Sequence, residues 1–362
     1  MYKIKRRFHF CIVIIEILKK KGEVMFKNIG RIKFAVLLIT LPLITALVCI
    51  GVGRYYLSAI ESLQILFRGL VLGQEHVSNQ SYSVVINMRL PRILLALLCG
   101  AGLAVAGSGL QALFSNPLVS PDTLGVASGA SFGAALALLF NGNMVAVQLS
   151  ALIFGIIAVF LTYNVGKIKG KTTIIMLVLS GMMISSLFQA LVSLIKYVAD
   201  TENQLPAITY WLMGSLGSAT FRSVAIGSVP IIVGCIILFG LRWKMNILSL
   251  TEDEARTLGV NVKKMRAVVI FASTMITASC VSMCGQIGWI GLLIPHMCRM
   301  MFGSNNKSVI PASISFGAVF MLIIDTIARS ATTSEIPISI LTSVIGAPCF
   351  IVLLRRTGGS NS

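Results

Sequence analysis

The chain has 362 residues, of which 56% are hydrophobic and only 12% are charged, whereas soluble domains carry about 25% charged residues. This balance excludes an ordinary soluble domain and predicts a helical membrane bundle, because each span needs about 20 residues. The formal net charge of +18 would suggest nucleic acid in a soluble protein. In a membrane protein Lys and Arg mark the cytoplasmic loops instead, so no nucleic-acid partner is expected.

Residues 1–33 are predicted to be an N-terminal cytoplasmic extension. The apolar run 8–18 contains Glu16, is too short to span a bilayer and has no small-residue cleavage site after it. Residues 20–24 could be encoded by a purine-rich stretch that resembles a ribosome-binding site. We therefore expect translation to start at Met25, with a transmembrane permease domain over 34–356 and a tail over 357–362.

Ten apolar segments follow in chain order, so the fold class is an all-α, polytopic membrane bundle of about ten transmembrane helices. The segments are 34–53, 89–113, 123–141, 145–164, 172–198, 222–241, 265–286, 289–302, 307–330 and 338–355. The eighth is short and is interrupted by Gly288, Gly291 and Pro295. It is therefore expected to be bent or held inside the bundle.

The positive charges indicate which side of the membrane each loop faces. With both termini in the cytoplasm, about 23 of the 30 Lys and Arg residues fall on the inner side. The outer side then holds only Arg54, Arg68, Arg89, Arg92, Lys196, Arg222 and Arg329. The bias predicts an even number of spans with both termini in the cytoplasm.

Small residues recur at the spacing that lets helices pack closely in lipid. Gly125, Gly129 and Gly133 are four residues apart, and Gly102 is paired with Ala106 in the same way. The pattern predicts a tight bundle and carries no information about a substrate.

No cofactor or metal site is predicted. The eight cysteines lie in or beside apolar runs without a C-x-x-C pair, and the histidines His9, His76 and His296 are far apart. The stretch from Gly166 to Thr172 resembles a phosphate-binding loop but has three residues between its glycines instead of four. The chain itself is therefore not expected to bind ATP.

The inner loop 242–264 is predicted to contain a short helix. Thr251 and Glu254 form a capping-box pattern, Glu252 favours the positive end of a helix dipole, and Gly259 is typical of a helix end. Ala255 and Leu258 would give this helix a small apolar face. From these residues alone, an interfacial linker helix and a docking helix for a soluble partner remain equally open.

Charged residues also border the spans on the outer side. Arg89 and Arg92 flank Pro91 at the start of the second segment, and Asp325 lies four residues before Arg329, so these two can meet on one helix face. The arginines could snorkel to the interface, and Asp325 could form a structural ion pair with Arg329. The alternative is a ring of positive charge that receives an acidic partner.

Several motifs, taken together and in order, resemble one family. They are Arg89-Leu90-Pro91-Arg92, residues 111–118 (QALFSNPL), 124–126 (LGV), 211–215 (WLMGS), 255–259 (ARTLG), 288–296 (GWIGLLIPH), 325–329 (DTIAR), 335–337 (EIP) and 346–348 (GAP). They are similar to motifs of the permease subunits of bacterial ABC importers for iron–siderophores, haem and cobalamin. The resemblance covers residues 34 to about 356.

The resemblance implies a type II ABC importer permease fold and a multi-pass protein of the bacterial inner membrane. The implied partners are a second permease copy, two ATP-binding subunits and an extracytoplasmic substrate-binding protein, besides membrane lipid. Arg89, Arg92 and Arg329 match the arginines that dock the binding protein. The coupling helix that contacts the ATPase would comprise Thr251, Glu252, Glu254, Ala255, Arg256, Leu258 and Gly259.

The implied function is import of an iron chelate, with haem or cobalamin possible, by alternating access and with ATP hydrolysed by a separate chain. The main alternative is a secondary active transporter without an ATPase partner. That class uses several acids inside the membrane, and Asp325 is the only acid deep in a predicted span. The chain also lacks the H-E-x-x-H signature of catalytic sites, and the resemblance implies a transport subunit, so it is not expected to be an enzyme.

Overall fold

The computed structural model describes residues 30–55, 57–71, 79–168, 171–250 and 252–358. Within them the chain is helical, apart from a two-stranded antiparallel hairpin of β1 (Lys167–Ile168) and β2 (Lys171–Thr172). Almost all of the predicted N-terminal extension lies outside the described residues, including the expected start Met25. Thr251 and residues 359–362 lie outside them as well.

Ten apolar helices correspond to the ten predicted segments, so the all-α bundle of about ten spans is confirmed. Seven are long and apolar enough to cross a bilayer: α2 (Arg31–Gly51), α5 (Leu90–Phe114), α7 (Met144–Val165), α8 (Ile174–Val198), α10 (Phe221–Leu241), α12 (Val262–Cys284) and α14 (Asn306–Ser330). Three are shorter in their apolar part: α6 (Val126–Leu139), α13 (Ile290–Phe302) and α15 (Ile338–Gly358).

The sequence did not predict most of the short elements between the spans. These are α3 (Ala59–Val71), α4 (Asn79–Tyr82), the π-helix η2 (Ser83–Arg89), the 3₁₀ helices η3 (Pro121–Leu124) and η4 (Lys244–Ser249), and α9 (Gln204–Leu212). The short inner helix expected around 251–259 is present as α11 (Glu252–Thr257). Short segments of mixed polarity give weak periodicity, which explains why only α11, with its capping pattern, was found.

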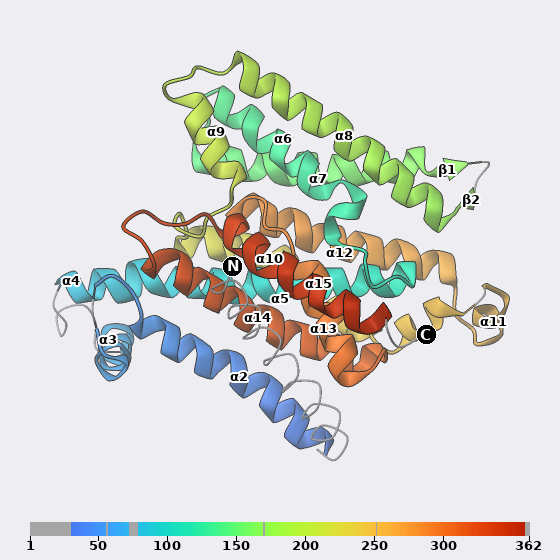
Figure 1. Ribbon diagram of the computed structural model, residues 1–362, viewed down its shortest axis with the longest axis horizontal. Coiled ribbons are helices and arrows are strands. Elements are labelled where there is room, and N and C mark those ends of the chain that lie inside the picture. The colour runs from blue at the N-terminus through green and yellow to red at the C-terminus, as the bar shows by residue number, and fades with distance from the viewer. Residues whose placement is uncertain (1–29, 56, 72–78, 169–170, 251, 359–362) are drawn as a thin grey trace.

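The helices form two groups that meet along α12. In Figure 1, α6, α7, α8 and α9 lie together on one side, and α2, α5, α10, α13, α14 and α15 lie with α12 on the other. Helix α5 is central in the larger group, where α10, α12, α13 and α14 all pack against it. Helix α12 also contacts α6 and α7, so it joins the two groups.

Helix α5 is apolar around its whole circumference and almost fully buried, as expected of a helix surrounded by others. Its small residues allow close contact: a Cβ atom added to Gly107 would lie 1.8 Å from the carbonyl oxygen of Gly291 on α13. A side chain there would force the two helices apart. In α6 the predicted packing residue Gly133 similarly faces the backbone of α7, where an added Cβ would lie 2.3 Å from Ser150 O.

Lipid-facing surface is supplied by the peripheral helices. Large apolar side chains stand exposed along α2, α7, α8 and α10, including Ile39, Phe160, Met183 and Ile236. An apolar belt of this extent is stable only against hydrocarbon or another protein, so it supports the predicted membrane location.

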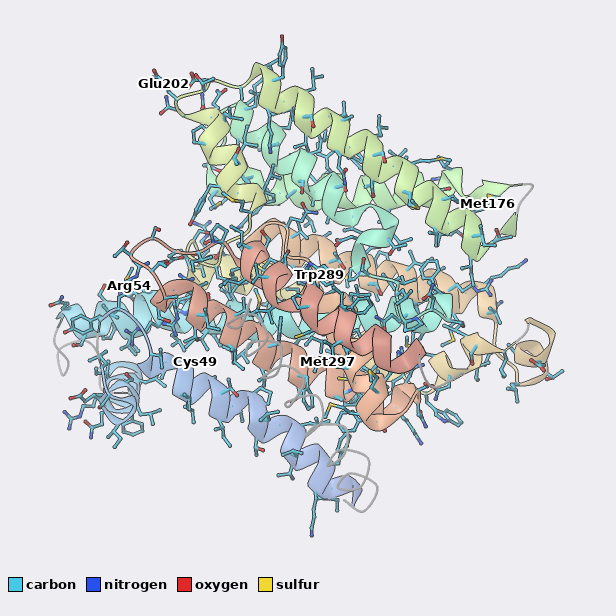
Figure 2. All side chains as sticks on the ribbon, in the orientation of Figure 1. Cys49, Arg54, Met176, Glu202, Trp289 and Met297 are labelled. Atoms are coloured by element: carbon cyan, nitrogen blue, oxygen red, sulfur yellow. The ribbon has the colours of Figure 1, made fainter. Side chains whose placement is uncertain are left out.

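The two ends of the bundle are distinguished by labelled side chains in Figure 2. Arg54 and Glu202 lie at one end of the long helices and Met176 lies at the other. We call these the outer end and the inner end, following the predicted threading. Helix α5 begins at the outer end and finishes at the inner end, where η4, α11 and the β-hairpin also lie.

Candidate functional sites

A cluster of charged side chains is buried at the outer end, where α5 begins. The π-helix η2 runs directly into α5, and Arg89 and Arg92, three residues apart, share a helix face. Arg92 donates from Nε to Asp325 Oδ1 at 2.7 Å and from Nη1 to Glu335 Oε1 at 2.6 Å. Arg329 Nε lies 3.6 Å from Asp325 Oδ2. Two carboxylates thus bind arginines from two helices.

The same arginines cover the end of α2. Arg89 donates to Ile50 O at 2.7 Å, to Gly51 O at 3.3 Å and to Tyr55 O at 2.6 Å, and Arg329 donates to Cys49 O. The last carbonyl groups of a helix have no partner within the helix, and positive charge is favourable at this end of the helix dipole. The cluster therefore ties α2, α5 and α14 together.

The burial of these arginines differs from the expected outward ring. Arg89, Arg92 and Arg329 are only 5%, 8% and 8% exposed, and Asp325 is 1% exposed. All three arginines bind internal partners, because unpaired charge at this depth would be costly. Asp325 does lie near Arg329, but its shorter contact is with Arg92. Docking of a binding protein by these residues stays a prediction.

Glu335 belongs to the cluster, although it was not predicted as a site residue. It lies in the loop between α14 and α15, its side chain is 32% exposed, and its partner Arg92 is 243 positions away in the chain. Its signal in the sequence was the motif 335–337 (EIP), which marked the residue without indicating what it contacts. Its partner could not be identified without the tertiary structure.

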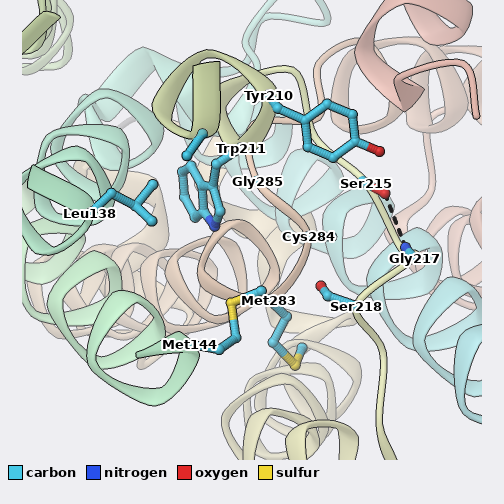
Figure 3. A pocket seen from close by; sticks show the side chains of 11 residues that line it. Leu138, Met144, Tyr210, Trp211, Ser215, Gly217, Ser218, Met283, Cys284 and Gly285 are labelled. Atoms are coloured by element: carbon cyan, nitrogen blue, oxygen red, sulfur yellow. Dashed lines mark hydrogen bonds between the residues drawn. The ribbon is translucent and has the colours of Figure 1, made fainter. Parts of the chain in front are cut away.

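A pocket of about 280 Å³ lies between α6, α7, α9 and the end of α12. Figure 3 shows the sulfur atoms of Met144 and Met283 below the indole ring of Trp211, and Cys284 also lines the pocket. On the other wall Gly217 donates its N–H to Ser215 Oγ at 3.0 Å. No charged residue lines this pocket, so it suits an apolar group and offers no acid–base chemistry.

The segment from η4 to α11 lies at the inner end and has both buried and exposed residues. Ala255 is fully buried against the core, whereas Leu258 is 60% exposed. The predicted apolar face of these two residues is therefore only half buried: Ala255 packs into the core, whereas Leu258 follows the end of α11 at Thr257 and stays exposed. Gly259 has a φ of +72°, and Val260 N–H donates to Ala255 O at 3.1 Å. This closes the helix as expected for a glycine at this position.

The remaining predicted residues of α11 are described only in part. Thr251 and the side chains of Glu252 and Arg256 lie outside the described residues, so the capping box of Thr251 with Glu254 is not tested. The backbone places residues 252–257 in the helix.

Asn246 in η4 connects this segment to the transmembrane helices. Its side chain donates to Asn305 Oδ1 at 2.9 Å and accepts from Asn306 N–H at 2.9 Å, so η4 is joined to the first turn of α14. Helix α14 carries Asp325 and Arg329 near its other end. One continuous helix therefore links η4 with the outer charged cluster.

The described part of the chain contains neither a cluster of metal-ligating side chains nor a disulfide. No group of three or more His, Cys, Asp or Glu side chains there could hold a metal ion. The cysteines of this part are all free, and most are buried.

Comparison with known proteins gives the family. The model of the FecCD transport family matches residues 39–356. The chain belongs to the FecCD transport family. FecCD proteins are permease subunits of ABC transporters, which are transport components and not catalytic themselves, so the chain is a multi-pass membrane permease.

Three proteins similar to this chain match it over most of its length. The molybdate import system permease protein MolB of Haemophilus influenzae is 44% identical over 324 residues, covering 89% of this FecCD chain and 95% of MolB. An iron chelatin transport system permease protein of Helicobacter pylori is 38% identical over 80% of this chain and 87% of its own length. A metal-chelate type ABC transporter, solved in an inward-facing conformation, matches with a TM-score of 0.81 and 42% identity over 90% of this chain and 99% of its own.

Proposed function

We propose that this FecCD chain is the permease of an ATP-driven importer whose cargo is a metal oxyanion, with molybdate as the first candidate. The observation that carries the proposal is the 44% identity to a molybdate permease along almost the entire length of both chains. The spans carry little charge, which suits weak contacts along the path, because tight binding would slow release.

An iron chelate is the second candidate cargo. It is supported by the Helicobacter pylori relative named for iron chelatin and by the likeness to the metal-chelate type transporter. In molybdate and in ferric chelates alike, oxygen ligands surround the metal. A secondary active transporter finds no further support, since the family is one of ABC permeases and Asp325 is already paired with Arg92.

The inner segment η4–α11 is proposed to dock the ATP-binding subunit. Leu258 offers an exposed apolar contact on a short helix whose other face is anchored in the core through Ala255. Closure of the ATP-binding subunits would move this segment, and the bonds of Asn246 to Asn305 and Asn306 would pass the movement to α14. Alternating access would follow as the helices shift.

The outer cluster is proposed to receive the binding protein. Three arginines face two carboxylates, so one positive charge is in excess. Glu335 is the more exposed of the two acids, and an acidic group of the binding protein would reach Arg92 by replacing it. This is compatible with the burial of the arginines when the permease stands alone.

The proposed function is tested by uptake in a deletion strain with and without this chain restored. The panel comprises labelled molybdate, ferric siderophores, haem and cobalamin, each with and without ATP depletion. We expect ATP-dependent uptake of molybdate. Uptake of a ferric chelate alone would select the second candidate, and uptake driven by the proton gradient would contradict the ATP-driven mechanism.

Docking through α11 is tested by Leu258→Asp, with Leu258→Met as the control that keeps an apolar side chain. We expect Leu258→Asp to leave folding unchanged, since the side chain is exposed, and to reduce transport-linked ATPase activity about tenfold or more, in the range of interface hot spots. Leu258→Met should retain activity. Equal activity of both variants would contradict the docking role.

A further inference from the structure

A second cavity, of about 700 Å³, opens at the inner end where α5 finishes. Its walls come from the end of α5, from η4, from α13 and from the loop between α13 and α14. Most of its lining residues are polar, and those that matter here are Gln111, Asn116, Asn246, His296, Arg299 and Asn306. It lies at the opposite end of α5 from the arginine cluster.

Arg299 gives this cavity an uncompensated positive charge. Its guanidinium donates to three neutral acceptors: Gln111 Oε1 at 3.4 Å, Ser108 O at 3.2 Å and Ser304 O at 3.4 Å. These distances are at or beyond the long end of the range for N–H···O bonds. No lining residue is acidic, and no ion pair of Arg299 occurs within the described part of the chain. The guanidinium is thus held loosely.

Two further lining residues carry buried polar atoms without a partner. His296 is 6% exposed, and neither ring nitrogen has a hydrogen-bond partner among the described residues. Asn306 is 4% exposed, and its side-chain oxygen is also unpartnered there. A buried polar group that lacks a hydrogen-bond partner is destabilising, so both side chains would gain from a ligand. His296 and Arg299, three residues apart, share one face of α13.

We infer that this cavity binds a small tetrahedral oxyanion beside Arg299 and His296. An oxyanion accepts hydrogen bonds from a guanidinium and from an imidazole N–H, and its negative charge balances the positive charge of Arg299. The transport role of this site rests on the proposed function: it is the last weak binding site before release of the cargo. The loose bonds of Arg299 suit such a site, because the guanidinium can exchange a weak internal acceptor for the anion.

Two other occupants would satisfy the same charge. Inorganic phosphate shares the tetrahedral chemistry, and competition distinguishes it from the cargo. An acidic side chain of the ATP-binding subunit could also enter, since η4 lines the cavity.

The test uses the full chain in complex with its ATP-binding partner in lipid nanodiscs, without the binding protein. Tungstate is the probe, because its tungsten atom can be located by anomalous scattering. We expect saturable binding, with tungsten beside Arg299 and His296. Arg299→Gln should weaken binding about tenfold or more, and Arg299→Lys should keep most of it. Arg242→Gln, at a partly exposed arginine that does not line the cavity, should not change it.

The outcomes separate this inference from the proposed function. Absence of tungstate binding, binding that Arg299→Gln leaves unchanged, or a partner side chain in the cavity would overturn the inference. Phosphate that displaces tungstate as well as molybdate does would overturn its transport role. Tungstate binding without molybdate uptake would contradict only the proposed cargo, whereas molybdate uptake without binding in this cavity would contradict only the inference.

Discussion

The two ends of α5 differ in how the positive charges beside them are paired. At the outer end Arg89, Arg92 and Arg329 are buried, and carboxylates or helix-terminal carbonyls bind all of them. At the inner end Arg299 contacts only neutral acceptors on the wall of an open cavity. A charge that is buried away from water needs strong internal partners, whereas a charge on the wall of a cavity remains available to bind a ligand.

The difference separates a structural role from a binding role. The outer cluster joins three helices and should contribute mainly to stability until a partner competes for it. The inner arginine joins few elements and should contribute little to stability. Variants at the two ends therefore test the comparison directly through unfolding measurements of the purified protein.

The largest effect is expected for Asp325→Asn. It leaves Arg92 and Arg329 without their shared carboxylate in a site where Asp325 is 1% exposed, and loss of one partner from a buried ion pair costs about 3–5 kcal/mol. The free energy of unfolding in detergent measures it. Glu335→Gln is the matched control and should cost about 1 kcal/mol or less, because that carboxylate is partly exposed. Equal losses of unfolding free energy in Asp325→Asn and Glu335→Gln would contradict the larger structural role assigned to Asp325.

A smaller loss, about 2 kcal/mol, is expected for Arg89→Gln. The variant removes the charged donor from Ile50 O and Tyr55 O, and hydrogen bonds to charged groups contribute about 1.5–3 kcal/mol. Hydrogen exchange should show the last turn of α2 opening first. Arg54→Gln, at an exposed neighbouring arginine, should leave both measurements unchanged; an equal effect there would contradict the capping role.

At the inner end Arg299→Gln should cost only about 1 kcal/mol. Its three bonds are long, and no carboxylate loses its partner when the charge is removed. The same unfolding assay measures it. A loss as large as that of Asp325→Asn would show that Arg299 is structural and would end the contrast between the two ends.

The smallest effect is a pH dependence at Asp122, in the η3 turn between α5 and α6. Burial raises the pKa of this carboxyl from 3.8 to about 6. The folded state then holds a proton more tightly than the unfolded state, so stability is greatest below pH 4 and falls as the pH rises towards 6. Asp122→Asn should abolish this fall, because the amide does not titrate. Parallel profiles of unfolding free energy against pH for the unmodified protein and Asp122→Asn would contradict this prediction.

The sequence was most informative about the long spans and least about what their charges contact. The ten segments were found because some twenty apolar residues in a row leave little alternative to a membrane helix. The helix α11 was found from its capping pattern and Gly259. Of its predicted apolar pair only Ala255 is buried, because Leu258 lies just beyond the end of the helix, and which residues of a short helix are buried depends on its neighbours.

The contacts within the candidate sites likewise fall into those that the sequence could predict and those that it could not. Asp325 and Arg329 are four residues apart on one helix, so the sequence alone could bring them together. Arg92 with Glu335, and Arg299 with Gln111, are joined only across the fold. Arg299 could have been noticed as a cation inside an apolar segment, which is uncommon and often functional.

By itself, then, the sequence determined that this protein lies in a membrane as a bundle of about ten apolar helices, because hydrophobicity acts locally along the chain. The tertiary structure alone decided which charges are paired inside the protein and which one faces a cavity. Those contacts join residues far apart in sequence, and only packing brings them within hydrogen-bond distance.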